Sequence, residues 1–310
     1  MRLGIPGGMY YYKYEPFIKA FFNELNVSAQ FSVKSNKNIF NAGAADCVDE
    51  ACFPVKLFNG HVAKLSERCD AVVVPRLMNT EFGESICPKF CGLPELVGRA
   101  GCSKNKIDAM KPQGNLAYTR PLFLNKPEAL ENTLAIETVH LGFSHDQFDK
   151  AFFTGLDAQK YTQRGVNDIG YKYKVFLAGH PYNIHDSYSN LNLIDKLHAM
   201  DIGVITEEFV CRGDKEAELG NLLKMPYWAS FIDIFATGKA LIKQRAIDGI
   251  IALSSFSCGT DAFTLEMLKN HIGTFPFLVM KLDEQTGEAG FDTRLEAFES
   301  VLSGQGRMRA

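Results

Sequence analysis

The chain has 310 residues, of which 46% are hydrophobic and 22% charged, and its formal net charge is -3. This length accommodates two domains of about 150 residues or one larger domain, and the charge gives no basic footprint for nucleic acid. The apolar runs are far shorter than a membrane span, and the N-terminus lacks the apolar stretch of a signal peptide. We therefore expect a soluble, cytoplasmic protein that contacts neither nucleic acid nor membrane, and whose eight cysteines are thiols rather than disulfides.

Strands and helices alternate in the first part of the chain. A strand at residues 3–6 precedes a helix at 14–25, in which apolar side chains recur every three or four residues. A second strand covers 29–33, and a second helix covers 54–65 with a proline in its first turn. The segment 71–75 is apolar on both faces, which is typical of a buried strand in a parallel sheet.

The middle of the chain has a different pattern. Residues 98–118 are polar and broken by glycine and proline, which indicates an irregular excursion. Residues 127–166 predict two helices, the second of which is capped by Ser144 or Asp146. We expect these helices to form a bridge. The predicted divisions are an N-terminal domain, a helical bridge and a C-terminal domain, at residues 1–125, 126–168 and 169–310.

The second half repeats the alternation of the first. Its predicted strands cover 174–179, 203–205, 249–256 and 276–281. Its predicted helices cover 188–200, 225–247, 261–268 and 294–302. Repeated strand–helix–strand units predict an α/β fold with an open, mostly parallel sheet, flanked by helices, in each half. Two such domains that face one another leave a cleft at their strand ends.

Three cysteines from distant parts of the chain stand where a predicted strand gives way to a loop or helix. These are Cys52, Cys87 and Cys258, each beside glycine, proline or helix-capping residues. The N-terminus of a helix favours a thiolate, and we expect Thr260 or Asp261 to cap the helix after Cys258. Gly259 lets the backbone pass close to a bulky group. Thiolates that arrive singly on different strand ends can close on one soft metal centre, most often an iron–sulfur cluster.

Other interpretations of the cysteines remain open. Each of the three can be a small buried hydrophobic residue, which is common for cysteine. Zinc is the alternative metal, although its usual Cys-x2-Cys pairs are absent. Cys47 and Cys91 lie close enough in sequence to be additional ligands. Cys69 and Cys102 are interpreted as ordinary helix-end or loop thiols, and Cys211 is left open.

Two polar segments follow predicted strands of the second half. His180 begins the first, Gly179–Asp186, at a carboxyl end of the sheet, where open α/β folds bind ligands. It can donate a hydrogen bond to a substrate oxygen or carry a proton; alternatively it only bonds to backbone. The second is the loop Asp283–Gly290, which can hold a ligand or simply turn the chain. We expect both segments to face the metal centre and to contact substrate rather than metal. Gly7-Gly8 is too short for a dinucleotide fingerprint.

Several of these motifs together resemble one protein family. They are Ile5–Tyr14, Cys47–Lys56 with Gly60-His61, Pro75-Arg76, Cys87–Pro94, Gly179–Asp186, Ser257–Asp261 and Asp283–Phe291. They spread over nearly the whole chain, which resembles the acyl-CoA dehydratase activase-related proteins. That family is a branch of the 2-hydroxyacyl-CoA dehydratase and double-cubane cluster protein superfamily.

The resemblance implies both a fold and a cofactor. The expected fold has two Rossmann-like domains around an iron–sulfur cluster, 4Fe–4S or double-cubane, in the cleft between them. By motif, the superfamily's three ligand positions fall on Cys52, Cys87 and Cys258. An ATP-hydrolysing activase with its own 4Fe–4S cluster is the implied partner and supplies low-potential electrons. Because larger family members carry the activase on the same chain, we expect a separate activase here. We also expect a homo- or heterodimer.

Two classes of function follow from the sequence and the resemblance. The first is a redox enzyme, a dehydratase or reductase component that acts on an acyl-CoA or another small molecule. The second is a non-catalytic cluster carrier, or a regulatory metal- or ligand-binding module, that keeps the same fold. A cofactor-free small-molecule binder is a third, weaker interpretation. Family membership predicts the metal centre better than it predicts the reaction.

Overall fold

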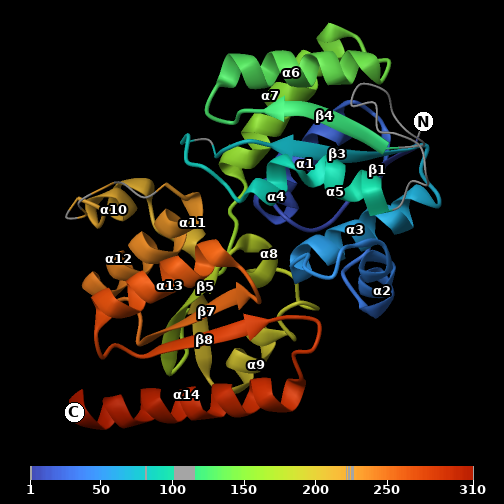
Figure 1. Cartoon of the computed structure of the whole chain (residues 1–310). Helices are drawn as coiled ribbons and strands as arrows, with labels where there is room; N and C mark the ends of the chain where they lie inside the picture. Colours follow the sequence, from blue (N-terminus) through green and yellow to red (C-terminus); the bar gives the residue numbers. More distant parts are fainter. Residues whose placement is uncertain are drawn as a thin grey trace. The chain divides into compact units, whose positions relative to one another are not determined.

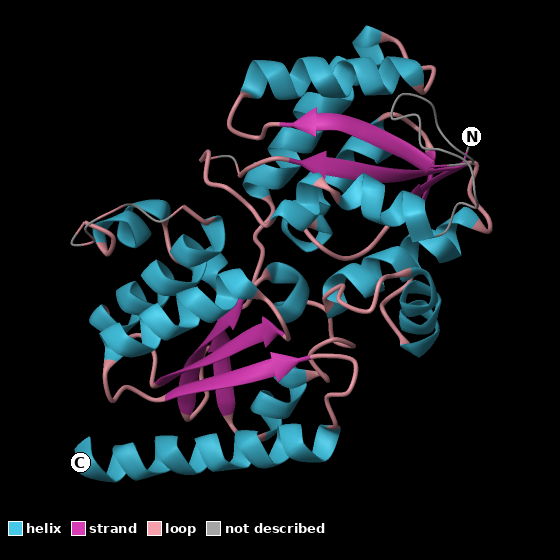
Figure 2. Ribbon diagram, in the orientation of Figure 1, coloured by secondary structure: helices cyan, strands magenta, loops and turns pink. Residues whose placement is uncertain are grey.

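The computed structural model describes residues 2–80, 82–100, 116–220, 222, 224 and 227–309 (Figure 1). It divides the chain into two compact units, Met1–Gln163 and Arg164–Ala310. Each unit is built on a four-stranded parallel sheet with helices against it (Figure 2). The predicted α/β class, with a mostly parallel sheet in each half, is therefore confirmed.

The first unit begins with β1 and ends with α7. Its elements are β1 (Arg2–Ile5), α1 (Tyr11–Glu24), β2 (Ser28–Phe31), α2 (Lys37–Asp46), α3 (Phe53–Ser66), β3 (Ala71–Leu77), α4 (Pro88–Cys91), α5 (Leu93–Ala100), β4 (Leu116–Leu122), α6 (Pro127–His140) and α7 (His145–Tyr161). The strands are parallel and lie in the order β2-β1-β3-β4. The neighbouring strands β1 and β3 therefore form the centre of the sheet.

The helices predicted as a bridge pack within the first unit. Phe148 and Phe152 of α7 are buried with Phe21 of α1 and Leu3 of β1 in one apolar cluster. Ser144 caps α7 through a reciprocal capping box with Gln147, which settles the two predicted caps in favour of the serine. The helical part of residues 126–168 thus covers one side of the first sheet.

Two glycines let α2 and α3 cross closely. A Cβ at Gly43 would overlap the carbonyl oxygen of Lys56 and lie 2.6 Å from the backbone nitrogen of Gly60. A Cβ at Gly60 would in turn overlap the carbonyl oxygen of Ile39. Backbone atoms cannot move aside as a side chain can, so the contact requires glycine on both helices. This contact fixes the position of α3, which begins directly after Cys52.

The second unit has the same strand order as the first. Its elements are β5 (Tyr173–Gly179), α8 (Pro181–Ile184), α9 (Leu193–Ala199), β6 (Ile202–Ile205), η1 (Glu207–Phe209), α10 (Arg212–Ala217), α11 (Ala229–Phe231), the π-helical turn η2 (Ile232–Ala236), α12 (Thr237–Lys243), β7 (Gly249–Ser255), α13 (Gly259–Ile272), β8 (Phe277–Leu282) and α14 (Glu288–Arg309). The order is β6-β5-β7-β8, again parallel throughout. Strands β1 to β4 of the first sheet therefore correspond, in chain order, to strands β5 to β8 of the second.

Helices cover both faces of the second sheet. Phe176 and Ala178 of β5 pack into a cluster with Phe235 and Leu268 on one face. Val175 and Leu177 alternate with them and pack against α9 and α14 on the other face. This explains why β5 and β7 are apolar along their whole length, as expected for central parallel strands. No helix among the described residues is both long enough and apolar enough to cross a membrane.

Some predicted element boundaries are wrong. The helix expected at 188–200 forms only at Leu193–Ala199, and the helix expected at 225–247 runs from Ala229 through a π-helical turn to Lys243. The irregular excursion expected at 98–118 is wrong at both ends, where α5 reaches Ala100 and β4 begins at Leu116, and its residues 101–115 lie outside the described residues. Strand β4 was not predicted, because Pro121 interrupts its pattern. The structure places β4 at the edge of the sheet, where a proline is tolerated. Helix α14 begins at Glu288, so it takes up part of the expected 283–290 loop.

Candidate functional site

The centre of the second sheet is a topological switch point. From β5 the chain continues to β6 on one side, and from β7 it continues to β8 on the other. Ligands of open α/β sheets bind in the crevice outside the carboxyl ends of two such strands. His180 directly follows β5, and Cys258 follows β7 after a two-residue turn. Both residues stand at strand ends, where the sequence placed them.

Local backbone geometry brings these two strand ends together. Gly179 has a φ of 159°, and a Cβ there would lie 2.8 Å from the carbonyl oxygen of Leu253 on β7. Glycine therefore permits the close approach of the two chains just before His180. On the other strand, Ser257 has a φ of 63°. This left-handed residue turns the chain so that Cys258 becomes the N-cap of α13, and the expectation that Thr260 or Asp261 caps the helix is wrong.

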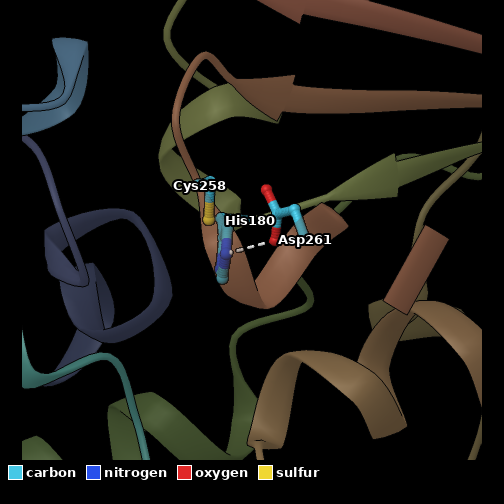
Figure 3. A group of neighbouring side chains, drawn as sticks. All are labelled: His180, Cys258 and Asp261. Carbon is cyan, nitrogen blue, oxygen red and sulfur yellow. Dashed lines mark ion pairs between the residues drawn. The ribbon is translucent and has the colours of Figure 1, made fainter. Parts of the chain in front are cut away.

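His180, Cys258 and Asp261 form a compact group at this point (Figure 3). The imidazole Nε2 of His180 lies 2.9 Å from Oδ1 of Asp261. One donor atom from each of the three residues lies within 4.8 Å of the others. His180 is 6% exposed and Asp261 0% exposed, whereas Cys258 is half-buried. The His180 ring also stacks on Tyr182 with a centroid distance of 4.9 Å, which fixes its plane.

The charges of this group are set by opposing effects. Burial lowers the pKa of His180, but the Asp261 carboxylate outweighs burial and, with help from Cys258, raises that pKa well above its usual value. Burial raises the pKa of Asp261, and the charge of His180 outweighs it, so the pKa of the carboxyl is lowered. The two residues are therefore an ion pair. Hydrogen bonds from the Cys258 and Ser254 side chains also help to lower the pKa of Asp261.

Asp261 was expected only as a helix cap, and its place in the site was missed. The sequence offered one signal, a charged residue three positions after a candidate ligand at the start of a helix. That signal does not distinguish a cap from a side chain that turns toward another strand. His180 and Asp261 are 81 residues apart in the sequence, and only the sheet topology brings them together.

In the first unit, Cys52 and Cys87 also stand at helix N-termini. Cys52 is the N-cap of α3 and Cys87 is the N-cap of α4, and a proline follows each within two residues. Cys87 follows β3 through a loop, as expected. Helix α2 lies between β2 and Cys52, however, so the prediction that Cys52 stands directly at a strand end is wrong. Among the described residues of this unit, the two thiols belong to no group of three close metal donors.

The remaining thiols have distinct environments. The Asn59 side-chain amide donates to Cys47 Sγ; burial raises the pKa of Cys47 and outweighs this hydrogen bond. Cys91 Sγ donates to the carbonyl oxygen of Pro88 at 3.1 Å. Cys69 is buried, as expected of an ordinary structural thiol, and Cys211 is an exposed N-cap of α10. Cys102 lies outside the described residues. All seven described cysteines are thiols.

The predicted Asp283–Gly290 loop is shorter than expected and holds itself together. The Asp283 backbone nitrogen donates to Thr286 Oγ1 at 2.8 Å, and the Gln285 nitrogen donates to Asp283 Oδ1 at 2.8 Å. These bonds are typical of a self-contained turn between β8 and α14. The turn does follow a strand of the second sheet, at the same carboxyl edge as His180.

Comparison with known protein families gives a match over more than half of the chain. Residues 2–210 match the model of the family described as CoA enzyme activase uncharacterised domain (DUF2229). The match covers the first unit, with Cys52 and Cys87, and continues through β5, His180 and β6. It ends before Cys258 and Asp261. No curated protein matches the chain.

Proposed function

The chain belongs to the CoA enzyme activase domain family, and on that premise we propose that it is an iron–sulfur redox protein of the 2-hydroxyacyl-CoA dehydratase type. In this proposal Cys52, Cys87 and Cys258 hold a 4Fe–4S or double-cubane cluster between two Rossmann-like units, with Cys47 and Cys91 as candidates for further ligands. An ATP-dependent activase with its own 4Fe–4S cluster delivers low-potential electrons to it. The substrate is an acyl-CoA or another small molecule, and the protein acts as a homo- or heterodimer.

The surroundings of Cys258 carry this proposal. Its thiol is half-buried, lies at the switch point of the second sheet, and begins a helix of 14 residues. A Cβ at the next residue, Gly259, would meet no described atom within 4 Å, so packing does not require glycine there. The chain directly after the thiol thus borders open space. Helix N-termini also stabilise the negative charge of a thiolate.

The thiols of the first unit fit the same group. Cys52 begins α3, also a helix of 14 residues, and its side chain makes no capping hydrogen bond. It is half-buried, as is Cys87. Thiolates are the usual protein ligands of iron–sulfur clusters. The donor set of three half-buried thiols at helix N-termini is therefore chemically suited to a cluster, which when bound would supply one-electron transfer.

His180 is the proposed catalytic residue beside this centre. Its buried imidazole carries N–H donors at the strand end where a substrate would enter, and Asp261 keeps it charged. A hydrogen bond to a substrate oxygen that becomes anionic stabilises that charge, and losing such a donor commonly costs on the order of 10²-fold in rate. The turn that begins at Asp283 follows β8 at the same edge and is a second candidate for substrate contact.

One observation favours the second function, a carrier or a metal-binding module. His180, Cys258 and Asp261 form a donor group that lies wholly within the second unit. Such a group needs neither the thiols of the first unit nor an electron donor. The two functions therefore differ in whether reduction by an activase occurs.

Electron delivery tests the redox function. The protein is prepared anaerobically and mixed with a family activase, a low-potential reductant and ATP, and its visible absorbance is followed. We expect bleaching that requires ATP, with omission of ATP and the Cys258→Ser variant as controls. A protein that contains its cluster but is never reduced under these conditions would favour the carrier instead.

A further inference from the structure

Three different metal donors meet at the carboxyl ends of β5 and β7, entirely within the second unit (Figure 3). They are the imidazole of His180, the thiol of Cys258 and the carboxylate of Asp261. Their donor atoms lie within 4.8 Å of one another, and the imidazole and carboxylate are 2.9 Å apart. Donors at about 2.1 Å from a tetrahedral Zn²⁺ lie roughly 3.4 Å apart, so closure on one ion needs side-chain shifts of about 1 Å.

The burial of Asp261 sets this group apart from ordinary acidic clusters. Its side chain is 0% exposed, and its Oδ1 lies 2.9 Å from the His180 imidazole, so the buried carboxylate depends on a positive partner. A metal cation that takes the place of the imidazole proton would supply that charge and bind both residues, with the proton released to solvent. One Asp261 oxygen therefore faces the imidazole and the thiol, and the three donor atoms converge on one point.

We propose that the second unit binds a single divalent transition-metal ion of the Zn²⁺ class through His180, Cys258 and Asp261. Thiolate and imidazole select such ions over Mg²⁺ and Ca²⁺, which prefer oxygen ligands only. Three protein ligands leave a fourth position for water or a small ligand, as in catalytic rather than structural zinc sites. Thr260 Oγ1, 3.3 Å from Cys258 Sγ, is placed to hydrogen-bond the coordinating sulfur.

This inference does not rest on the proposed cluster, although both use Cys258. The cluster needs thiols from both units, whereas the single ion needs only residues of the second unit. The ion therefore occupies Cys258 in a chain that lacks its cluster. The requirement for Cys52 and Cys87 separates the two proposals experimentally.

Cobalt titration of the full-length chain tests the site. The protein is stripped with a chelator under reducing conditions and titrated with Co²⁺, whose bond to a thiolate gives a charge-transfer band. We expect saturation at a single equivalent and displacement by Zn²⁺ but not by Mg²⁺. The Cys258→Ser variant should lose the band. The His180→Gln and Asp261→Asn variants should bind Co²⁺ more weakly by more than the roughly 10–100-fold that loss of an outer-shell partner costs.

Matched thiol variants are the controls. Cys52→Ser, Cys87→Ser and Cys211→Ser, the last an exposed thiol of the same unit, should keep the band and the affinity. Far-ultraviolet circular dichroism checks that each variant is folded. If Cys258→Ser is not folded, the rise in melting temperature that Co²⁺ gives the unaltered chain is compared with that of the folded Asp261→Asn or His180→Gln variant, where it should be smaller. Absence of the band, its persistence in Cys258→Ser, or its loss in both Cys52→Ser and Cys87→Ser would overturn the proposal.

Discussion

Cys258 differs from the other proposed ligands in the charged pair beside it. The thiol lies next to a buried imidazolium–carboxylate pair, whereas Cys52 begins its helix without a comparable pair in the described first unit. Two further metal donors, His180 and Asp261, thus already lie close to Cys258. Of the proposed ligands, Cys258 therefore has the local structure best prepared to bind metal.

Single substitutions test the assignment of cluster ligands. Cys52→Ser, Cys87→Ser and Cys258→Ser should each sharply lower the iron content of anaerobically produced protein, because each removes a bond between protein and cluster. Cys69→Ser is the control and should keep its iron. Iron per chain is measured after purification without oxygen. Unchanged iron in the Cys258 variant would show that this ligand is wrongly assigned.

Cys47 and Cys91 decide the size of the proposed cluster. Each thiol is already engaged, Cys47 by Asn59 and Cys91 by the Pro88 carbonyl. If alanine at both positions lowers iron as strongly as loss of Cys52, more protein ligands are needed and the double-cubane form is favoured. If neither matters, a 4Fe–4S cluster on three thiols remains.

His61 is a buried histidine that should make stability depend on pH. It is 1% exposed, its Nε2 lies 2.9 Å from Ser35 Oγ, and burial lowers its pKa from 6.5 to about 4. Between these pH values the unfolded chain binds a proton at this site and the folded chain does not. The free energy of unfolding should therefore fall as the pH decreases from 6.5 toward 4, by up to about 1.4 kcal/mol per pH unit.

Urea unfolding at about pH 7 and about pH 5 measures this contribution. The His61→Gln variant removes the titrating group and should flatten the pH dependence of stability, while the amide can still hydrogen-bond to Ser35. His271→Gln is the matched control at an exposed position and should leave the slope as it is. Equal slopes in the His61 variant and the unaltered chain would contradict the assignment.

At the scale of elements, the crossing of α2 and α3 should be intolerant of any added side-chain atom. Gly43→Ala would push a methyl group into the Lys56 carbonyl oxygen, and the helices would have to separate. We expect a loss of about 3 kcal/mol or more in stability, at or above the upper end of ordinary overpacking. Because α3 begins directly after Cys52, iron content should fall as well.

Gly290→Ala provides the control for this substitution. Gly290 lies in α14, and a Cβ there would meet no described atom within 4 Å. Alanine should stabilise that helix by up to about 1 kcal/mol. Denaturant midpoints of the two variants measure the contrast. A Gly43 variant as stable as the unaltered chain would mean that the two helices do not pack this closely.

Periodicity predicts the central strands and long helices well but not the short elements. The strands β1, β3, β5, β7 and β8 were expected within a few residues, because continuous apolar runs between polar turns are distinctive. Helix α8 has only four residues and β4 contains a proline, so neither has a readable period. Likewise, the strand-end positions of His180 and Cys258 were predictable. The partner of His180 was not, because Asp261 reaches it through tertiary structure.

At the scale of the whole chain, the two units repeat one topology. Both sheets have a central pair whose strands connect outward in opposite directions, β1 with β3 and β5 with β7. Cys87 follows β3 as Cys258 follows β7, so each unit carries a thiol after the corresponding strand. The carboxyl ends of such central strand pairs are where open α/β sheets bind ligands. The proposed cluster is the function that uses both thiols together.

Iron and acid-labile sulfide in the anaerobically produced protein test that central claim most directly. We predict brown protein with roughly equal iron and sulfide, about four or more of each per chain, as for a cubane cluster held by thiolates. The measurement needs neither the substrate nor the activase. Stoichiometric zinc without sulfide, in protein expressed and purified without oxygen, would contradict the iron–sulfur account.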